Sequence, residues 1–274
     1  MKYKTKHNPP LRLGAALIGL LVLAAAAGSV VNAISPATAQ NLPEALHGPS
    51  LTHWLGCDAF GADLALQLFS GARQSLFIAA VVTTLNMILG LIIGTAAALA
   101  PRMVATAFTR LIDCFMAFPG LLLAILLGSI MPRSEHSIIL ALCLTGWTSR
   151  ARYVRALARG LAHEPFIEAA TAGGASRLRI VRRHLWPMMT GQLLVQAAMS
   201  MGSVVIAESS LSFLGLGGSI GNPSWGHLIA EGREYLVEAP HLSIFPGLAF
   251  VYAVIAFNLL AEGLRQRLNP SQDA

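Results

Sequence analysis

The chain has 274 residues, of which 55% are hydrophobic and only 12% are charged. Soluble domains carry about 25% charged residues, so the composition argues against an ordinary water-soluble protein and predicts a membrane protein. Lys and Arg outnumber Asp and Glu by 19 to 13, but these basic residues lie between long apolar runs, which points away from nucleic acid as the partner. The three cysteines show no metal-ligand spacing and are interpreted as small hydrophobic residues.

The N-terminal part begins with a basic tail, residues 1–10, which contains all three lysines. Residues 11–34 are predicted to form the first transmembrane helix, because Leu13–Ile34 holds 22 uncharged residues, enough to span about 30 Å of hydrocarbon. A secretory signal peptide starts similarly, but its apolar core has only about 7–15 residues. We therefore expect a retained helix, followed by an external loop over residues 35–74 that is rich in Pro and Gly.

A transmembrane core is predicted over residues 75–262, and its first helix is the clearest in the chain. Ser75–Ala100 contains no charged residue over 26 positions. Gly90 and Gly94 give this helix a small-residue surface, which another helix can approach closely.

The third span is expected over residues 104–131 and carries two opposite charges near its start. Arg110 and Asp113 lie three residues apart and therefore share one face of the helix. We interpret them as an ion pair near a helix end, and Asp113 is also a candidate for the substrate path.

The fourth span contains too few apolar residues to cross the membrane alone. Ser137–Ser149 has 13 uncharged residues, about 20 Å of helix. The helix must therefore continue through Arg150 and Arg152, whose charged ends are expected to extend to water at the cytoplasmic rim.

A basic segment between two apolar runs, Glu164–Pro187, predicts a helix, a glycine hinge and a second helix. Pro165 suits the first turn of a helix, and Gly173 with Gly174 ends it. Ser176 is a plausible N-cap for the second helix, in which Leu178, Val181 and Leu185 are expected to share one face. One interpretation is a basic helix that lies on anionic lipid.

The fifth predicted span, Leu185–Ala207, is followed directly by an acidic residue. A carboxylate such as Glu208 is costly at the outer end of a spanning helix unless it faces water or a partner. It is either a hydrated helix-end residue or a gate at the outer mouth of a translocation path, to which Ser212 would also belong. The last span, Leu242–Ala261, precedes a cytoplasmic tail over residues 263–274.

The distribution of basic residues orients the six predicted spans. With the N-terminus inside, three basic residues are external and sixteen are cytoplasmic. The external ones are Arg73, Arg133 and Arg233; the cytoplasmic ones are Lys2, Lys4, Lys6, Arg12, Arg102, Arg110, Arg150, Arg152, Arg155, Arg159, Arg177, Arg179, Arg182, Arg183, Arg265 and Arg267.

No catalytic motif, metal site or cofactor site is predicted. Because every lysine lies within the first six residues, the chain has no glycine-rich phosphate-binding loop with its lysine. Gly217–Gly221 matches G-x-S-x-G, but Asn222 and Pro223 follow at once, which does not suit the strand-to-helix turn of a hydrolase. The eight histidines include no H-E-x-x-H pattern.

Several motifs resemble those of one family, the permease subunits of bacterial ATP-binding cassette (ABC) importers for dipeptides, oligopeptides and nickel. The basic segment matches the family's cytoplasmic loop at Glu168, Ala169, Ala170, Gly174, Ile180 and Pro187. Other family motifs are matched by His53, Leu55, Gly56, Asp58, Gly61, Asp63, Arg110, Asp113, Ala117, Phe118, Pro119, Ser212–Gly217, Pro223, Trp225 and Gly226. Cys57 and Ala62 replace the family's Thr and Arg.

The resemblance implies an all-α, polytopic protein of the bacterial inner membrane with six transmembrane helices, the type I importer permease fold and both termini cytoplasmic. It implies a non-enzymatic transport subunit with an ATPase-coupling loop at residues 159–184. The implied partners are a second homologous permease, two ATP-binding subunits, an extracytoplasmic substrate-binding protein and membrane lipid. Pro165, Phe166 and Ile167 would join the matched residues in this loop, with Phe166 and Ile167 as its anchor. The cargo stays open among dipeptides, oligopeptides, nickel and metal chelates.

An ion-coupled secondary carrier is the alternative function. Such a carrier is expected to show repeated halves and charges at the midplane of the membrane. This sequence shows neither, since Asp113 and Glu208 are predicted near opposite rims.

Overall fold

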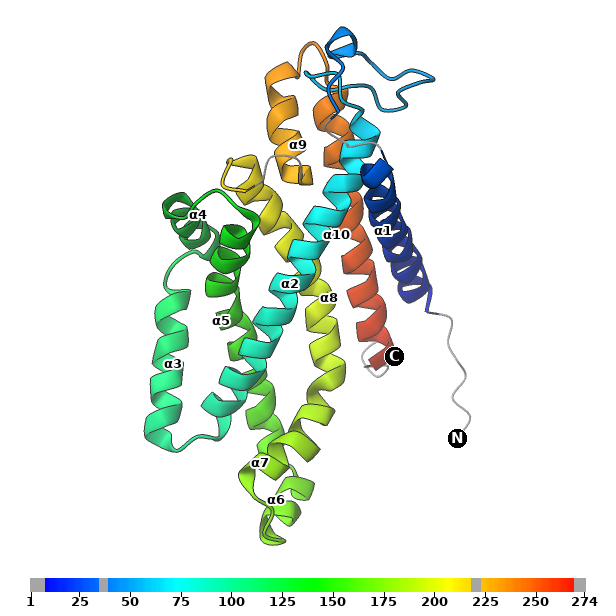
Figure 1. Ribbon diagram of the computed structural model, residues 1–274. Coiled ribbons are helices and arrows are strands. Elements are labelled where there is room, and N and C mark those ends of the chain that lie inside the picture. Colours follow the sequence, from blue (N-terminus) through cyan, green and yellow to red (C-terminus); the bar gives the residue numbers. More distant parts are fainter. Residues whose placement is uncertain (1–7, 35–38, 218–222, 269–274) are drawn as a thin grey trace.

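The computed structural model describes residues 8–34, 39–217 and 223–268, and every regular element in these ranges is helical (Figure 1). The long helices are joined by turns, by the loop of residues 39–63 and by several brief helical segments. The elements in order are α1 (Pro9–Ile34), η1 (Leu42–Glu44), α2 (Leu64–Leu99), α3 (Arg102–Met116), α4 (Gly120–Ile130), α5 (Glu135–Ala162), α6 (Pro165–Ala172), α7 (Arg177–Ile180), η2 (Val181–Leu185), α8 (Trp186–Phe213), α9 (Trp225–Gly232), η3 (Arg233–Tyr235) and α10 (His241–Leu268). The lysine tail over residues 1–7, the G-x-S-x-G pattern after Gly217 and the Asn269-Pro270 end lie outside the described residues.

Four helical stretches of the described chain are long and apolar enough to cross a membrane: Pro9–Val30, Leu64–Leu99, Arg177–Phe213 and His241–Leu268. The bent pair α3 and α4 raises the number to five if it is one broken span. The fourth predicted span is α5, which continues through Arg150 and Arg152 as expected and has 28 residues, but it is not among these apolar stretches. The prediction of six spans therefore stays a prediction.

The third predicted span is broken in the structure. Helix α3 ends at Met116, α4 begins at Gly120, and the two axes are bent by 77°. Pro119 explains the break, because its ring has no N–H to donate and disfavours a helical conformation at the preceding residue. The predicted span over residues 104–131 therefore consists of two helices, and it stays a prediction that the pair crosses the membrane as one broken span.

Two helices extend beyond their predicted ends. Helix α2 begins at Leu64, within the predicted external loop, because the Asp63 side chain caps it by accepting hydrogen bonds from the backbone N–H groups of Ala65 and Leu66. Helix α8 continues to Phe213, so Glu208 lies inside the helix and not after its end.

The most extensive helix pairing joins α2 to α5 and includes the two predicted glycines. A Cβ atom on Gly90 would lie 2.5 Å from Cβ of Arg150, and one on Gly94 would lie 2.5 Å from the carbonyl oxygen of Ala151. These distances are too short for any side chain, so the small-residue surface is the place where α5 meets α2.

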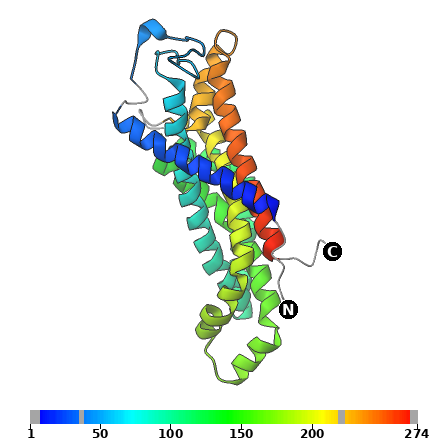
Figure 2. The same cartoon turned by 90° about the vertical axis from the view of Figure 1, so that its right-hand side faces the viewer.

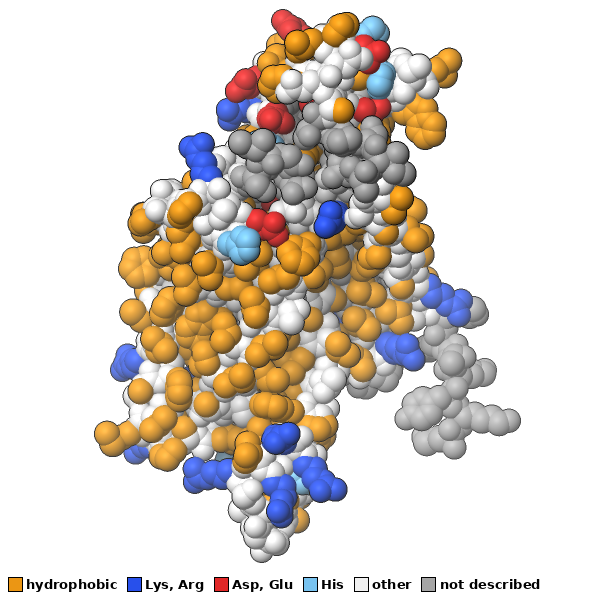
Figure 3. Space-filling view, viewed as in Figure 1, with side chains coloured by type: hydrophobic (Ala, Val, Ile, Leu, Met, Phe, Trp, Pro, Cys, Tyr) orange, Lys and Arg blue, Asp and Glu red, His pale blue; other side chains and the backbone are white. Residues whose placement is uncertain are grey.

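The bundle has two different ends. Near one end, α10 finishes beside the start of α1, where the Asn8 side chain donates to the carbonyl of Gly263, and α6 and α7 project beyond the bundle (Figure 1). The loop of residues 39–63 and α9 lie at the opposite end, and α1 crosses the other helices obliquely (Figure 2). The face drawn in Figure 3 shows a broad hydrophobic zone between a basic end and an acidic end, the surface expected of a chain that spans a bilayer.

Candidate functional site

A hairpin of α6, α7 and the turn between them is held against the bundle by one buried face. Ile167 of α6 and Ile180 of α7 are buried, and Leu185 just after them is fully enclosed. They pack with Val154 and Ala158 of α5 and with Met189 of α8. The hairpin is therefore anchored to the two long helices between which it lies in the sequence.

The turn inside this hairpin depends on one glycine. Gly174 has φ +78°, whereas Gly173 has an ordinary φ of −73°. The N–H of Ala175 donates to the carbonyl of Ala170, and the N–H of Gly174 donates to that of Thr171. This pair of bonds is the Schellman motif, which satisfies the last carbonyls of a helix and needs a left-handed residue at the position of Gly174. As predicted, Ser176 caps α7, through Arg179 N–H.

The opposite face of the hairpin is exposed and carries apolar side chains among charged ones. Phe166 is 37% exposed and lies beside the His184 ring, and Leu178 is 66% exposed. Leu178 therefore does not share the buried face of Leu185, contrary to the prediction, and Ile180 takes that place. The exposed charged residues here are Glu168, Arg177, Arg179, Arg182 and Arg183.

A direct contact connects the hairpin to the end of α2. Residues 181–185 form one π-helical turn that leads without a break into α8, and Pro187 occupies the first turn of α8. The indole N–H of Trp186 donates to Thr95 Oγ1 at 3.2 Å. The hairpin thus packs on α5 and α8, and the start of α8 is bonded to α2.

Glu208 and Ser212 lie together in an enclosed polar cluster near the other end of α8. Glu208 is fully buried, and its carboxyl group accepts from Ser75 of α2 at 3.0 Å and from Ser212 at 2.8 Å. Ser75 Oγ also accepts a hydrogen bond from the backbone N–H of Trp225, the first residue of α9, with an N···O distance of 3.4 Å. The cluster thus joins α2, α8 and α9, and Glu208 is not a hydrated helix-end residue. The role of Glu208 and Ser212 in a path or gate stays a prediction.

Asp113 lies apart from this cluster. It is exposed on α3 and lines a basic pocket with Arg102, Arg110, Arg155 and Arg159. Among the described residues no ion pair joins Arg110 to Asp113, so that expected contact is not formed. The role of Asp113 in a substrate path stays a prediction.

A cavity of about 450 Å³, which the sequence did not predict, opens between α2, α4, α5 and α8. Asn86 lines it, and the amide oxygen of Asn86 is buried with no partner among the described residues. Arg150, also in its wall, turns inward and donates to Ser200 of α8 at 2.7 Å, so it does not extend to the rim as predicted. The sequence did contain a signal for this cavity, because Asn86 and Arg150 are polar residues on apolar helices, and such residues usually face a pathway or a neighbouring helix.

The folded loop of residues 39–63 explains part of the matched external motif. His53 Nδ1 lies 2.8 Å from an oxygen of Asp63, the residue that caps α2, and Asp58 accepts the N–H groups of Phe60 and Ala62. The hydrogen bond to Asp63 raises the pKa of His53. Burial, reinforced by nearby carboxylates, raises the pKa of Cys57 to about 11.

Comparison with known proteins places these features in context. Residues 86–273 match the family model described as "Binding-protein-dependent transport system inner membrane component". The chain is 39% identical over 259 residues to a putative peptide transport system permease protein of Brucella suis biovar 1 (strain 1330), an alignment that covers 94% of this chain and 87% of that protein. It is 32% identical over 265 residues to the dipeptide transport system permease protein DppC of Alkalihalophilus pseudofirmus, covering 97% and 87%.

Two further similarities agree with these. A glutathione transport system permease protein, GsiD of Escherichia coli O6:K15:H31, is 37% identical over 228 residues, covering 82% of this chain and 74% of that protein. Among solved structures, the inward-facing MetNI methionine ABC transporter matches with a TM-score of 0.58 and 18% identity, covering 72% of this chain and 93% of that chain. At that identity the structural match supports the fold alone.

The two hairpin glycines provide a matched test of the turn. Gly174→Ala is expected to destabilise the hairpin by about 1–2 kcal/mol, because a left-handed residue strains a side chain even where the surrounding space is open. Gly173→Ala is expected to be neutral or to stabilise by up to about 1 kcal/mol. Hydrogen exchange of the backbone amides over residues 165–180 measures the stability of the hairpin in each variant. Equal protection in the two variants would contradict the assigned turn.

Proposed function

The chain belongs to the family of binding-protein-dependent transport system inner membrane components, and we propose that it forms half of the translocation pathway of an ABC importer for short peptides. It is a permease subunit and not an enzyme, since in this family ATP is hydrolysed by separate subunits. The peptide cargo is supported by relatives named for peptide, dipeptide and glutathione transport. An ion-coupled carrier is not favoured, and nickel has no specific support.

Family membership implies ATP-binding subunits and a substrate-binding protein as partners. The proposed assembly is one copy of this chain, a second homologous permease, two ATP-binding subunits and an extracytoplasmic binding protein, in the inner membrane. An open cavity with Asn86 and Arg150 in its wall supports a path that the second permease would complete. Candidate cargo peptides are tested on the binding protein, since that partner is expected to select the cargo.

The observation that carries the proposed mechanism is the two-faced hairpin. One face is buried against α5 and α8, and the other presents Phe166 and Leu178 among charged residues. A rigid element anchored on one side and apolar on the other suits docking into a groove of an ATP-binding subunit. Phe166 would then contact the partner, and Ile167 would hold the hairpin to its own chain.

Coupling is tested with Phe166→Ala and Glu168→Ala in a reconstituted transporter with its binding protein and a peptide. Truncating an anchor residue at an interface is expected to cost about 1–2 kcal/mol, a fivefold to thirtyfold loss of subunit affinity. Transport and peptide-stimulated ATP hydrolysis should fall together, while insertion into the membrane is unchanged.

Met103→Ala is the control for this experiment, because Met103 is an exposed apolar residue of α3, outside the hairpin. Normal transport by both hairpin variants would mean that the hairpin is only a lipid-facing surface.

Orientation is tested with paired reporter fusions, one active only in the cytoplasm and one only outside. The proposal has the hairpin and both termini cytoplasmic, supported by the basic residues that gather at that end. Fusions after Arg102 and Arg159 should report the cytoplasm, and fusions after Pro49 and Arg133 the exterior. An external signal after Arg159 would overturn the proposed topology.

Glu208 and Ser212 are proposed to control the outer end of the path by joining α2 to α8. In Glu208→Gln one acceptor oxygen becomes an NH₂ group, which costs about 1–3 kcal/mol where it leaves the Ser75 hydroxyl unpaired. We expect transport per assembled complex to fall, because the outer end then closes less firmly. Ser210→Ala is the control, since Ser210 is only partly buried and its hydroxyl donates to the carbonyl of Ile206 in the same helix. Equal transport by the two variants would leave Glu208 with a structural role alone.

A further inference from the structure

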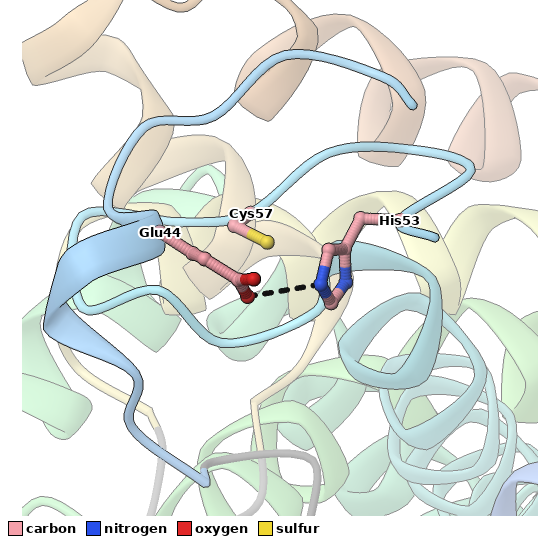
Figure 4. A group of neighbouring side chains, drawn as sticks. All are labelled: Glu44, His53 and Cys57. Carbon is pink, nitrogen blue, oxygen red and sulfur yellow. Dashed lines mark ion pairs between the residues drawn. The ribbon is translucent and has the colours of Figure 1, made fainter. Parts of the chain in front are cut away.

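Three side chains of different chemistry converge in the loop of residues 39–63, at the end of the molecule opposite the hairpin. Glu44 comes from η1, His53 from the following turn, and Cys57 from the strand-like segment that pairs with Asp63 (Figure 4). One ligand atom from each lies within 4.8 Å of the other two. We propose that Glu44, His53 and Cys57 bind a divalent transition-metal ion of the zinc class.

His53 is already oriented as a metal ligand would be. Its Nδ1 lies 2.8 Å from Asp63 Oδ2, while Asp63 Oδ1 accepts from the first N–H groups of α2. A histidine that binds a metal usually donates its second ring nitrogen to a carboxylate in this way, which fixes the tautomer. The other ring nitrogen, Nε2, then faces Glu44 and lies 3.0 Å from its Oε2 atom.

The spacing of the ligand atoms suits a small tetrahedral site. Nitrogen and oxygen ligands that bind zinc at about 2.0–2.1 Å lie roughly 3.3 Å from each other in tetrahedral geometry. The 3.0 Å between His53 Nε2 and Glu44 Oε2 is close to that value. Cys57 Sγ lies within 4.8 Å of both atoms. A movement of the thiol by roughly 1 Å at most would bring all three ligand atoms to tetrahedral spacing.

The electrostatic surroundings also suit a cation. Residues 39–63 contain Glu44, Asp58 and Asp63 but no Lys or Arg. A divalent cation would be attracted to these carboxylates, and on binding it would replace the proton of the Cys57 thiol. A thiolate, an imidazole and a carboxylate together favour zinc over calcium or magnesium, which prefer oxygen ligands alone.

Such an ion would fasten the loop to the start of α2. Its ligands come from η1 and from the two ends of the turn between His53 and Cys57, so one ion would tie residues 44–57 together. The hydrogen bond from His53 to Asp63 would connect them to the cap of α2. The side chains of Glu44 and His53 are 40% and 24% exposed, which leaves access from solvent. Three protein ligands leave a fourth position for water.

The test is a Co²⁺ titration of the full chain, purified in detergent through a tag without histidine. Cobalt bound by a thiolate shows a charge-transfer absorption, and Zn²⁺ should abolish it by competition. We expect about one cobalt per chain in the wild type. Cys57→Thr, the residue of the resembling family, should lose this absorption and bind at least tenfold more weakly, while Cys114→Ser and His47→Ala should keep both.

Asp63→Asn separates the metal site from the helix cap. Asparagine can still cap α2, so the chain should stay folded. Its NH₂ group, however, replaces the oxygen that accepts the hydrogen bond from His53, so cobalt affinity should fall about 10-fold to 100-fold. Size-exclusion profiles and helical circular dichroism check the fold of each variant. If the wild type shows no thiolate absorption, or Cys57→Thr binds cobalt equally well, then His53 only pairs with Glu44 and Asp63 and the proposal is wrong.

Discussion

The close contact between α2 and α5 is the constraint on which the rest of the structure depends. Within lipid, apolar side chains gain little by leaving their surroundings, so helices associate where their backbones can approach closely. Gly90 and Gly94 create that approach, and Arg150, Ala151 and Val154 of α5 lie directly against them. Because α5 is held along α2 at this point, its last turns emerge where they can support the hairpin.

Polar side chains inside the bundle are satisfied between helices, since a hydrocarbon environment offers them no other partner. Glu208 accepts hydrogen bonds from the hydroxyl groups of Ser75 and Ser212, and Arg150 donates a hydrogen bond to Ser200. Each of these contacts ties α8 to a neighbour or to its own next turn. Among the described residues, five side chains are exceptions, each with a buried nitrogen or oxygen atom that has no partner: Thr83, Asn86, Arg155, His241 and Ser243. Of these, Asn86 lies beside the cavity.

The residues with the clearest chemical roles lie on folded segments outside the long helices. The hairpin has a stiff turn and an apolar anchor, so it suits the transmission of movement. The loop of residues 39–63 instead brings together carboxylates, an imidazole and a thiol, held by the cap of α2. Rigid long helices support both, which is the usual arrangement for functional segments of a membrane protein.

The sequence by itself determined the class of protein, the family and the local features that follow from neighbouring residues. The apolar runs, the turn at Gly174, the cap at Ser176 and the surface of Gly90 and Gly94 were all predictable, because backbone conformation and helix faces are set within a few residues. The continuation of α5 past Arg150 followed from span length in the same way.

Only the tertiary structure decided which distant side chains meet. Ser75 and Glu208 are far apart in the chain, and no periodicity relates Glu44 to His53 and Cys57, so the polar cluster and the metal-ligand group were not predictable. The inward turn of Arg150 depends on packing in the same way, because its partner, Ser200, belongs to α8. A side chain's role in this protein is set by the helix that passes beside it, and that neighbour is chosen by the fold of the whole chain.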